Sequence, residues 1–577
     1  MMSVLHSARG WATGLRKASP IAALCVAIQI PFAGATTYYV SSGQGSDSNP
    51  GTNSNTPWQT LTMVMQKESS FRPGDSLLLK AGDVFDGPLD ISVLYPATAA
   101  APITVDRYGT GANPIIYGDH ETATWSATTG FTGIYQTSSL GPSWAIKVSK
   151  VYDTNGLKYY QMVQGTNTWT NYLNSFTNGC WGKSSDCTTI YVKTLDNNPP
   201  PQMRLMEWAC VCTPSYYTVQ NLEICYGGKG MESGSYGIIR SNYIHDCYAA
   251  GIGLYQVWGC QVCSNIVTRD ASTEVYLEAG GNHWVHHNTV SYTGMDYNRT
   301  ATIIAGNCVV SNTENANIGM QQGTNNLIEY NNLSYASSDF IDWWLEANDE
   351  VRDNYGFHAG IGTAVDGTGI KFHHNILDID GLGSGIFGYH DYDPTNSLSP
   401  DTGPVLIYNN VVYNFKGNGL YTVAGKSSVV FRNNIVSTPS TYVVMAAEVL
   451  STGADSDYNV FYSTGTPMFW LWNGSAHQNS LAAWKALSGQ DAHSIYADPR
   501  FVSPTPVVAA DFELQTNSPC IDAGQNLKLA GLLALAAQYQ DYLGTLIPQG
   551  AGPDIGAYES TIGSLSTPTG LHVIPGQ

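Results

Sequence analysis

YNNVVYNFKGNGLYTVAGKSSVVFRNNIVST, residues 408–438, contains one short phrase twice. Residues 409–412 (NNVV) return as residues 433–436 (NNIV), 24 residues later, with Gly-rich punctuation between them. An Asn followed by apolar residues at a fixed distance indicates a structural unit that recurs along the chain.

The same phrase, an Asn before an apolar pair, recurs between residues 221 and 459 of the 577-residue chain. Its members are Asn221, Asn242, Asn265, Asn288, Asn332, Asn375, Asn410, Asn434 and Asn459, with gaps of 21, 23, 23, 44, 43, 35, 24 and 25 residues. A period in the low twenties is typical of a solenoid. The segments between are short alternating strands broken by Gly, without an amphipathic helical repeat or the Leu skeleton of a leucine-rich repeat. Each period therefore predicts one coil of an all-β parallel β-helix, made of roughly three short strands and three turns.

The repeated Asn has a structural role in this interpretation. Its side chain can bond neighbouring backbone in a tight turn and tolerates left-handed geometry. Amides stacked at one corner of successive coils can also bond each other in a ladder. We expect the adjacent histidines to be structural as well, namely His286, His287, His373 and His374.

Both ends of the chain carry long, specific phrases. YYVSSGQGSDSNPGTNSNTPWQTL (38–61) and RPGDSLLLKAGDVFDG (72–87) resemble the opening of secreted right-handed parallel β-helix proteins. DPRFVSPTPVVAADFELQTNSPCIDAG (498–524) and GPDIGAYE (552–559) resemble their C-terminal closure. This superfamily includes pectate lyase-like, alginate lyase-like and glycoside hydrolase members. The resemblance therefore implies a right-handed parallel β-helix and leaves the chemistry open among these classes.

One early segment, residues 121–206, does not follow the coil rhythm. It resembles the small β-domain inserted early in some β-helix glycosidases, such as certain xylosidases and fucosidases. The predicted organisation is a signal peptide (1–35), an N-terminal cap with the first coils (36–120), the inserted β-domain (121–206), central coils (207–465), a closing segment (466–560) and a linker or tail (561–577).

The N-terminus has the features of a secretory signal peptide. Arg9, Arg16 and Lys17 give a basic start, residues 21–30 are apolar, and residues 33–35 (AGA) suit a cleavage site. The apolar run is shorter than the ~20 residues that a membrane span needs, and no later segment is long and apolar enough. We predict export to the extracellular space or periplasm, with cleavage near Ala35.

The net charge limits the classes of molecule that the protein is expected to bind. Removing residues 1–35 leaves 22 Lys and Arg against 45 Asp and Glu, a net charge of −23. Nucleic acid and anionic membranes are therefore disfavoured. Strongly anionic polysaccharides are disfavoured too, unless Ca²⁺ or a local basic cleft intervenes. We expect a monomer that acts on a polysaccharide and requires no cofactor; a Ca²⁺ site is left open, and no metal ligands are assigned.

Ten cysteines remain after loss of Cys25, an even number that suits disulfides in an oxidising compartment. Cys180 and Cys187 can form a disulfide that closes a loop, and Cys225 and Cys247 can stack on successive coils. The pairing itself cannot be read from the sequence. A zinc site at residues 260–263 (CQVC) is disfavoured because there is no second CxxC.

The three widest gaps predict extra segments near residues 293–316, 336–362 and 389–403. Long loops on neighbouring coils would form a wall beside a groove, the shape that an extended polysaccharide needs. The middle segment contains the pair Trp343-Trp344. These rings can be part of the core or form a platform for the apolar faces of sugars.

Alignment of the strands that precede the Asn corners predicts a row of outward side chains. The row is Tyr255, Glu278, Gln321 and Val365, with Asp366 at the strand end and Tyr276 two residues before Glu278. An acid, aromatics and amides on one exposed sheet form a plausible binding face.

Glycoside hydrolysis usually needs two carboxyl groups, one as proton donor and one as nucleophile or base. The favoured pair is Glu278 and Asp366, which lie two coils apart if the wide gaps contain no hidden coil. Asp342, Glu346 and Asp391 are reserve candidates. Residues 390–391, in GIFGYHDYDP, loosely resemble an acid-bearing strand end in related glycosidases, with His390 in place of one expected acid.

Two other functions stay open. A polysaccharide lyase or epimerase needs a base and a group that neutralises the uronate carboxylate. The central coils show no clustered Lys/Arg motif, although Tyr276 with His283 or His358 is a possible base. A non-catalytic adhesin or glycan-binding protein is the second alternative. The acidic balance favours hydrolysis of a neutral or weakly charged glycan.

Overall fold

The protein was analysed as a computed structural model. It describes residues 34–561 apart from 93–96, 122–123, 138–147, 154–157, 163–172, 174–176, 185–188, 195, 201–202, 208, 248, 271, 292–315, 391–400, 423–427, 439–442, 448–453, 472–475, 536 and 538. The predicted signal peptide therefore lies almost wholly outside the described residues. No helix among the described residues is long and apolar enough to cross a membrane.

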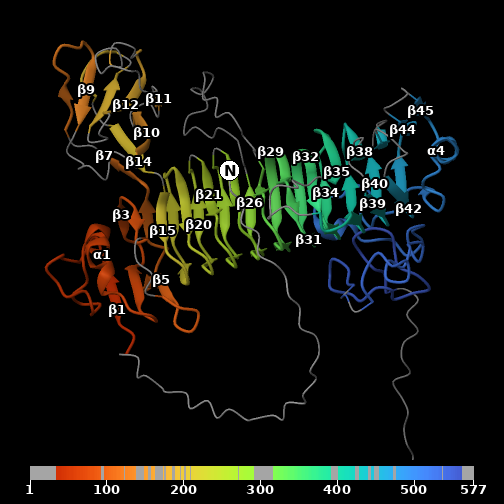
Figure 1. The fold of residues 1–577 in the computed structure, drawn as a ribbon, viewed down its shortest axis with the longest axis horizontal. Helices are drawn as coiled ribbons and strands as arrows, with labels where there is room; N and C mark the ends of the chain where they lie inside the picture. Colours follow the sequence, from red (N-terminus) through yellow and green to blue (C-terminus); the bar gives the residue numbers. More distant parts are fainter. Residues whose placement is uncertain are drawn as a thin grey trace, which may run out of the picture. The chain divides into compact units, whose positions relative to one another are not determined.

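Successive coils stack in chain order, so that each strand pairs in parallel with the equivalent strand of the next coil (Figure 1). This arrangement confirms the predicted right-handed parallel β-helix. Three series of strands run along the stack, and each coil contributes one strand or part of a strand to each series.

The first series is a 13-stranded sheet. Its strands are β1 (Thr37–Val40), β2 (Ser76–Lys80), β5 (Ile103–Tyr108), β16 (Tyr217–Gln220), β19 (Ile238–Arg240), β22 (Gln261–Cys263), β25 (Trp284–His286), β28 (Leu327–Glu329), β31 (Glu350–Arg352), β33 (Lys371–His373), β36 (Val405–Tyr408), β39 (Val429–Arg432) and β42 (Ala454–Asp457).

The second series carries the candidate site described below. Its strands are β4 (Leu89–Asp90), β15 (Ala209–Thr213), β18 (Lys229–Ser233), β21 (Ala250–Tyr255), β24 (Thr273–Glu278), β27 (Ile318–Gln321), the later parts of β29 (Asn332–Trp344) and β32 (Tyr355–Thr368), β30 (Glu346–Ala347), β35 (Ser384–His390), β38 (Asn418–Thr422), β41 (Val443–Ala447) and β44 (Met468–Leu471), which also pairs with β45 (Ala476–Gln478).

The third series joins the second because β29 and β32 run through the corner between them. Its strands are β3 (Val84–Asp86), β6 (Ile115–Tyr117), β17 (Glu223–Cys225), β20 (Tyr243–His245), β23 (Ile266–Thr268), β26 (Thr289–Ser291), the first parts of β29 and β32, β34 (Ile376–Asp378), β37 (Val411–Tyr413), β40 (Ile435–Thr438), β43 (Val460–Ser463) and β46 (Ile495–Tyr496).

The remaining elements lie outside these three series. An eight-stranded sheet contains β7 (Asp119–Glu121), β8 (Ser126–Ala127), β9 (Ile134–Thr137), β10 (Val148–Asp153), β11 (Lys158–Met162), β12 (Cys180–Lys183), β13 (Ile190–Lys193) and β14 (Met203–Glu207). Its strands run from Asp119 to Glu207, slightly beyond the stretch 121–206 predicted as an inserted β-domain; the six segment boundaries stay a prediction. The helices are α1 (Leu61–Lys67), η1 (Glu68–Ser70), α4 (Leu481–Ser488) and η3 (Ala509–Phe512).

Strand alternation builds the core of the helix. In β24, Val275 and Leu277 point inward and are buried, whereas Tyr276 and Glu278 are partly exposed. The same alternation repeats coil after coil, so that Ile252, Val275 and Ile318 lie in register inside the helix. The apolar stack fixes the register, because a slip by one residue would turn the apolar side chains outward.

A ladder of nine buried asparagines runs along one corner, as predicted. In each step a side-chain N–H donates to the amide oxygen of the next coil over 3.0–3.2 Å. The members are Asn242, Asn265, Asn288, Asn331, Asn354, Asn375, Asn410, Asn434 and Asn459.

The repeated NN phrase has two distinct functions. In 433–434 the first residue, Asn433, adopts the left-handed conformation with φ of 55°, and the second, Asn434, enters the ladder. The residue before each ladder position is left-handed throughout, for example Tyr330 and Asp353. The expectation that one Asn does both jobs was therefore wrong.

Three assignments along the ladder also differ from the sequence expectation. Asn221 is not a member: it is the left-handed residue, with φ of 58°, and the next residue, Leu222, donates its backbone N–H to Asn242. Asn331, not Asn332, occupies its position, and Asn354 was missed because Tyr355-Gly356 follows it in place of an apolar pair. The 43-residue gap between Asn332 and Asn375 therefore holds a complete coil. The predicted loop at 336–362 does not exist, since these residues form much of β29, β31 and β32.

Seven cysteines of the described residues form no disulfide, namely Cys180, Cys210, Cys225, Cys247, Cys260, Cys263 and Cys520. Cys225 lies opposite His245 in the register, not opposite Cys247 as expected. The proposed Cys180–Cys187 staple involves a residue outside the described part of the chain.

Candidate functional site

The outward side chains of the second series form the candidate site. Tyr255, Glu278 and Gln321 lie side by side on β21, β24 and β27, as the alignment predicted. The next member is Trp344, which pairs with Gln321. Val365, expected in this row, is instead fully buried. The inward Leu277 lies eleven residues before Asn288, whereas its equivalent Val365 lies ten residues before Asn375, so the alignment was one residue out of step.

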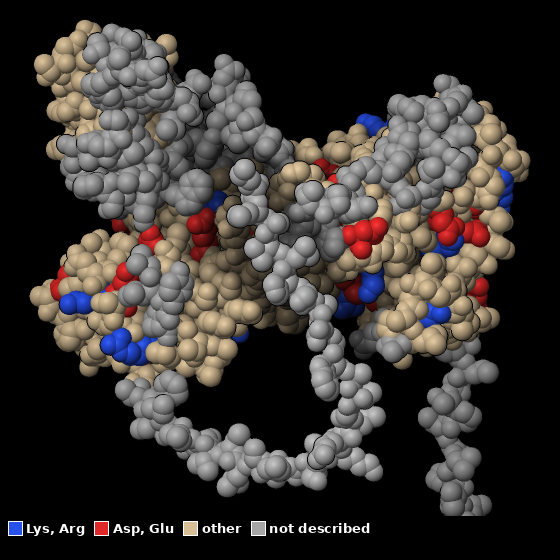
Figure 2. All heavy atoms as spheres, viewed as in Figure 1, with Lys and Arg blue, Asp and Glu red and all other residues tan. Residues whose placement is uncertain are grey.

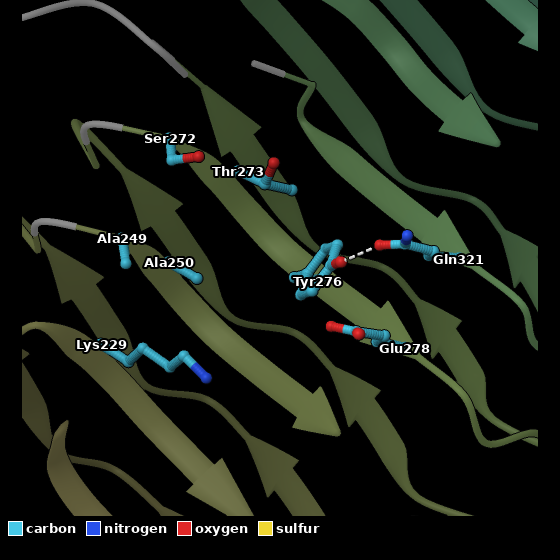
Figure 3. Close-up of a pocket in the computed structure, with 8 residues that line it drawn as sticks. All are labelled: Lys229, Ala249, Ala250, Ser272, Thr273, Tyr276, Glu278 and Gln321. Atoms are coloured by element: carbon cyan, nitrogen blue, oxygen red, sulfur yellow. Dashed lines mark hydrogen bonds between the residues drawn. The ribbon is translucent and has the colours of Figure 1, made fainter. Parts of the chain in front are cut away.

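An open pocket of about 400 Å³ lies beside this row. It is lined by Lys229, Ala249, Ala250, Ser272, Thr273, Tyr276, Glu278 and Gln321. Figure 3 shows that the side chains of Lys229, Tyr276 and Glu278 face the same space. The Tyr276 hydroxyl donates to the Gln321 side-chain oxygen.

Glycines on both sides of Tyr276 open this pocket. Gly253 and Gly319 occupy the same row on the two neighbouring strands. A Cβ at Gly319 would lie 3.2 Å from the Tyr276 ring, and a Cβ at Gly253 would lie 3.2 Å from the Lys229 side chain. The absence of side chains at these positions lets Tyr276 and Lys229 lie along the sheet surface.

Two carboxyl groups lie on adjacent strands near the pocket. Asp342 of β29 pairs with Ala364 of β32, and Asp366 is two residues further along the same strand. Both side chains point outward, so they are diagonal neighbours with Cα atoms about 7–8 Å apart. Asp342 shares its row with Gly319 and hence with Tyr276.

Burial changes the acid strength of Asp342. It raises the pKa of this carboxyl above its ordinary value, against the smaller opposing effect of the Trp343 backbone N–H, which donates to Oδ1 at 3.0 Å. A raised pKa favours the protonated form that a general acid needs.

The favoured pair, Glu278 and Asp366, is too far apart. The register runs from β24 through β27 and β29 to β32, which places three strand spacings between them, about 14 Å. The expectation of two coils was wrong because the coil containing Asn354 was hidden in a wide gap.

Two other predicted site residues are buried. Trp343 is 3% exposed, packs against Phe372 and donates its indole N–H to Thr363. Of the two alternatives for the tryptophan pair, Trp343 is therefore core, whereas Trp344 is 42% exposed.

Glu346 was a reserve catalytic candidate, but its side chain is fully buried. It accepts the Gly323 backbone N–H at 2.7 Å. Burial and the nearby Asp349 carboxyl raise the pKa of Glu346 well above its ordinary value. This acid has a structural environment and does not reach the pocket surface.

The last two predicted residues lie at the end of β35. His390 is in register with Gly367, and its Nε2 lies 3.3 Å from Asp401 Oδ1. Asp391 falls outside the described residues, as do most of the segments predicted near 293–316 and 389–403. Tyr389, which the sequence reasoning missed, pairs with Asp366.

The charge of the described site is mainly negative. Lys229, also missed, forms an ion pair with Glu232 at 2.5 Å. Among the described residues that line the pocket, the charged side chains are Glu278 and this already paired lysine. Asp342 and Asp366 add two acids on the strands beyond the pocket. The signal that could have identified Lys229 is the coil repeat, because Lys229 lies one coil before Ala250 in the register. Figure 2 shows that charged side chains are sparse over much of the described surface on this side.

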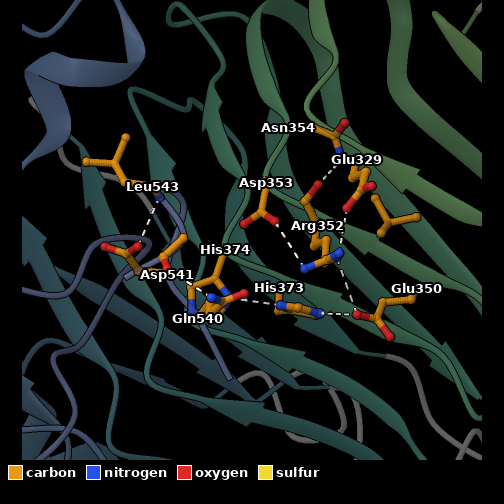
Figure 4. A network of polar contacts seen from close by, with 12 residues as sticks. Glu329, Glu350, Arg352, Asp353, Asn354, His373, His374, Gln540, Asp541 and Leu543 are labelled. Carbon is orange, nitrogen blue, oxygen red and sulfur yellow. Dashed lines mark hydrogen bonds and ion pairs between the residues drawn. The ribbon is translucent and has the colours of Figure 1, made fainter. Parts of the chain in front are cut away.

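A second charged cluster lies on the first series (Figure 4). Arg352 forms ion pairs with Glu329 at 2.6 Å, Glu350 at 3.5 Å and Asp353 at 3.6 Å. His373 adds a contact to Glu350 at 3.3 Å, and this histidine, Glu329 and Asp353 are buried. Mutual pairing and burial indicate a structural network and not a substrate site.

The base candidates for lyase chemistry do not adjoin Tyr276. His283 is 2% exposed, accepts the Cys260 backbone N–H, and has its pKa lowered to about 4 by burial. His358 contacts Asp380 at 2.7 Å in the third series. Among the described residues, no group of three or more His, Cys, Asp or Glu side chains could hold a metal ion.

One solved structure has a similar fold over most of the chain. A structure of XylC in complex with xylose matches with a TM-score of 0.54 and 13% sequence identity, over 91% of this chain and 98% of that chain. At this identity, the likeness of the two β-helix proteins shows the fold alone.

Other matches are weaker or shorter. Pectate lyase Pel9A gives a TM-score of 0.41 at 15% identity over 92% of this β-helix chain and 97% of that chain. The GH136 lacto-N-biosidase from Eubacterium ramulus gives 0.41 at 18% identity, over 76% and 65% of the two chains. Neither score is high enough to support an argument about this protein.

One curated protein matches locally. A stretch of 74 residues, 13% of the β-helix chain, is 46% identical to the lacto-N-biosidase of Bifidobacterium longum subsp. longum. The match spans only 5% of that protein's length. No protein-family profile matches the chain.

Proposed function

We propose that the protein is an exported enzyme that hydrolyses glycosidic bonds in a neutral polysaccharide, with Asp342 and Asp366 as the carboxyl pair. The observation that supports it best is the adjacency of these outward acids on β29 and β32, beside an aromatic row and an open pocket. The carbohydrate-active class is also supported by the local likeness to a lacto-N-biosidase.

The spacing of the two acids suits hydrolysis. Inverting glycosidases hold their carboxyl groups about 6.5–9.5 Å apart, and retaining ones about 5–5.5 Å. Diagonal neighbours on adjacent strands, about 7–8 Å apart at Cα, favour the inverting arrangement. In that mechanism a water molecule occupies the space between the second carboxylate and the sugar.

Each group then has a defined role. Asp342, whose pKa is raised by burial, donates a proton to the leaving oxygen. Asp366 acts as the base that activates water. Tyr276 and Trp344 contact the sugar rings, and Glu278, Gln321 and Tyr255 bind hydroxyl groups along the same row. His390 lies at the far end of the site, beyond Asp366.

Charge favours hydrolysis over elimination. A lyase must neutralise a uronate carboxylate, whereas the sheet face carries the acids Glu278, Asp342 and Asp366. The lysine of the described pocket lining is already paired to Glu232. Lyase or epimerase chemistry remains the second candidate because Lys229 and Tyr276, both able to act as bases, line the pocket.

The deciding experiment is a product assay on neutral and uronate polysaccharides. We expect new reducing ends without ultraviolet absorbance from a neutral polymer. Asp342→Asn and Asp366→Asn should each lower kcat by at least about 100-fold, the usual contribution of acid–base catalysis. Glu513→Gln, at an exposed position in the closing segment, is the charge-matched control and should leave kcat unchanged.

Three results would contradict the proposal. An unsaturated, ultraviolet-absorbing product would identify a lyase. Wild-type rates in Asp342→Asn would remove this residue from the catalytic pair. Tight glycan binding without any cleavage would indicate the adhesin alternative. N-terminal sequencing of protein recovered outside the cell, beginning after Ala35, tests export separately.

A further inference from the structure

A second pocket lies on the third series of strands, away from the row that carries Asp342. Its volume is about 360 Å³. β37, β40 and β43 form one side, and residues 498–517 of the closing segment form the other. The pocket therefore exists only because the closing segment folds back over the coils.

Two tyrosines and one serine line the sheet side of this pocket. Tyr413, Ser437 and Tyr462 occupy one row on successive strands. The two aromatic residues are thus two strand spacings apart, about 9.6 Å, with a small side chain between them. The small Ser437 side chain leaves a hollow in the sheet surface, flanked by the rings of Tyr413 and Tyr462.

Other aromatic residues hold both rings. Tyr413 contacts Phe512 edge-on, with ring centroids 5.3 Å apart. Tyr462 lies 6.3 Å from Tyr496 by the same measure. Aromatic surfaces that are fixed before binding lose little freedom when a flat, apolar sugar face packs on them.

The closing segment supplies polar groups that are fixed by their own contacts. Asp498 accepts the Arg500 backbone N–H at 2.8 Å, and the Arg500 side chain donates to the Asn517 carbonyl at 3.0 Å. Gln515 donates to the Phe501 carbonyl at 2.8 Å. Among the described residues of the lining, Asp498 carries one negative charge and Arg500 carries one positive charge. These balanced charges suit an uncharged ligand with many hydroxyl groups, and not an ion.

We propose that this pocket is a second glycan-binding site that takes one neutral pyranose unit of a polysaccharide chain. Glycoside hydrolysis uses two carboxyl groups, and the described residues of the lining contain one, that of Asp498, so the site binds without cleaving. Resting on the proposed function, it would keep the polymer near the catalytic sheet and raise its effective concentration there.

The test is affinity gel electrophoresis in an Asp342→Asn background, with soluble xylan, galactan or mannan in the gel. This background separates binding from cleavage, so the result holds even if the proposed hydrolysis fails. For at least one polymer, Tyr462→Ala should raise the dissociation constant about fivefold to tenfold, as expected for loss of one aromatic contact. Tyr462→Phe keeps the ring and should bind like its parent.

Two further variants keep the test decisive. Arg500→Ala alters the opposite wall without touching the sheet and should also weaken binding. Tyr236→Ala removes a 50% exposed aromatic elsewhere and should have no effect. Free xylose, galactose and mannose added as competitors separate a site for a single sugar from one that needs a polymer.

The proposal is wrong if the parent binds none of the three polymers. It is also wrong if Tyr462→Ala and Arg500→Ala both bind as the parent does. Loss of binding in Trp344→Ala alone would place all glycan binding at the candidate catalytic row. Displacement of the polymer by millimolar free monosaccharide would contradict the polymer specificity.

Discussion

At the scale of single residues, a shift of one position along a strand decides whether a side chain points into the core or onto the candidate site. Trp343 and Trp344 are chemically identical, yet the first is buried against Phe372 and the second is exposed beside Gln321. Asp342 owes its position to the same alternation, because it points outward between the inward side chains of Ile341 and Trp343. A sequence window identifies such residues but not their direction.

The raised pKa of Asp342 predicts a pH dependence of catalysis. A general acid works only while protonated, and burial keeps this carboxyl protonated to higher pH than the ordinary value of about 3.9. We therefore expect kcat/KM to fall as pH rises through the raised pKa of Asp342. The profile of kcat/KM against pH measures it in the free enzyme. A basic limb at the ordinary carboxyl pKa would argue against this assignment.

At the scale of elements, the asparagine ladder joins the coils at one corner. Asn354 accepts the backbone and side-chain N–H groups of Asn331 and donates to Ile328, Arg352 and Asn375. Four of these five contacts are buried, and the contact to Arg352 is partly buried. A substitution there leaves several polar groups unpaired.

We expect Asn354→Ala to lower the free energy of unfolding by roughly 2–4 kcal/mol, since each buried group left without a partner costs about 1–3 kcal/mol. Urea denaturation followed by circular dichroism measures the loss. Asn332→Ala is the matched control, because Asn332 is exposed and lies outside the ladder. Equal effects of the two substitutions would contradict the structural role of the ladder.

The sequence predicted the coil, its strands and the ladder because these depend on short-range pattern. The prediction failed where the position of a residue depends on the number and length of the coils before it. Asn354 lacks the apolar pair that marks the other members, so one coil was hidden. A one-residue difference in the spacing before Asn375 placed the buried Val365 in the outward row. The separation of Glu278 from Asp366 was underestimated for the same reason, and Lys229 was missed as a neighbour of the pocket.

At the scale of the whole molecule, the closing segment covers apolar side chains on the first series. Leu527, Leu533, Tyr539 and Ile547 pack against Leu406, Tyr408 and Val430. Tyr539 also donates its hydroxyl to Asn409 at 2.7 Å. A solenoid needs such cover because the last repeats otherwise expose their apolar surface.

The packing of the closing segment on the first series predicts that two leucines of this segment contribute differently to the free energy of unfolding. Leu527 is 1% exposed and Leu529 is 81% exposed. Leu527→Ala should lower the unfolding free energy by about 2–5 kcal/mol, the usual cost of truncating a buried leucine. Leu529→Ala should leave it nearly unchanged. Thermal and urea unfolding of both variants check this, and similar values for the two would show that the segment does not pack as described.

The uniform stacking of the coils has a consequence for how such a catalytic centre can change in evolution. Groups on neighbouring coils are separated by fixed increments of about 4.8 Å. Gain or loss of one repeat between two acids would therefore move them apart or together in a single jump, with no intermediate distances. Stereochemical outcome, which depends on that distance, would then switch by duplication or deletion of about 22 residues and not by gradual drift.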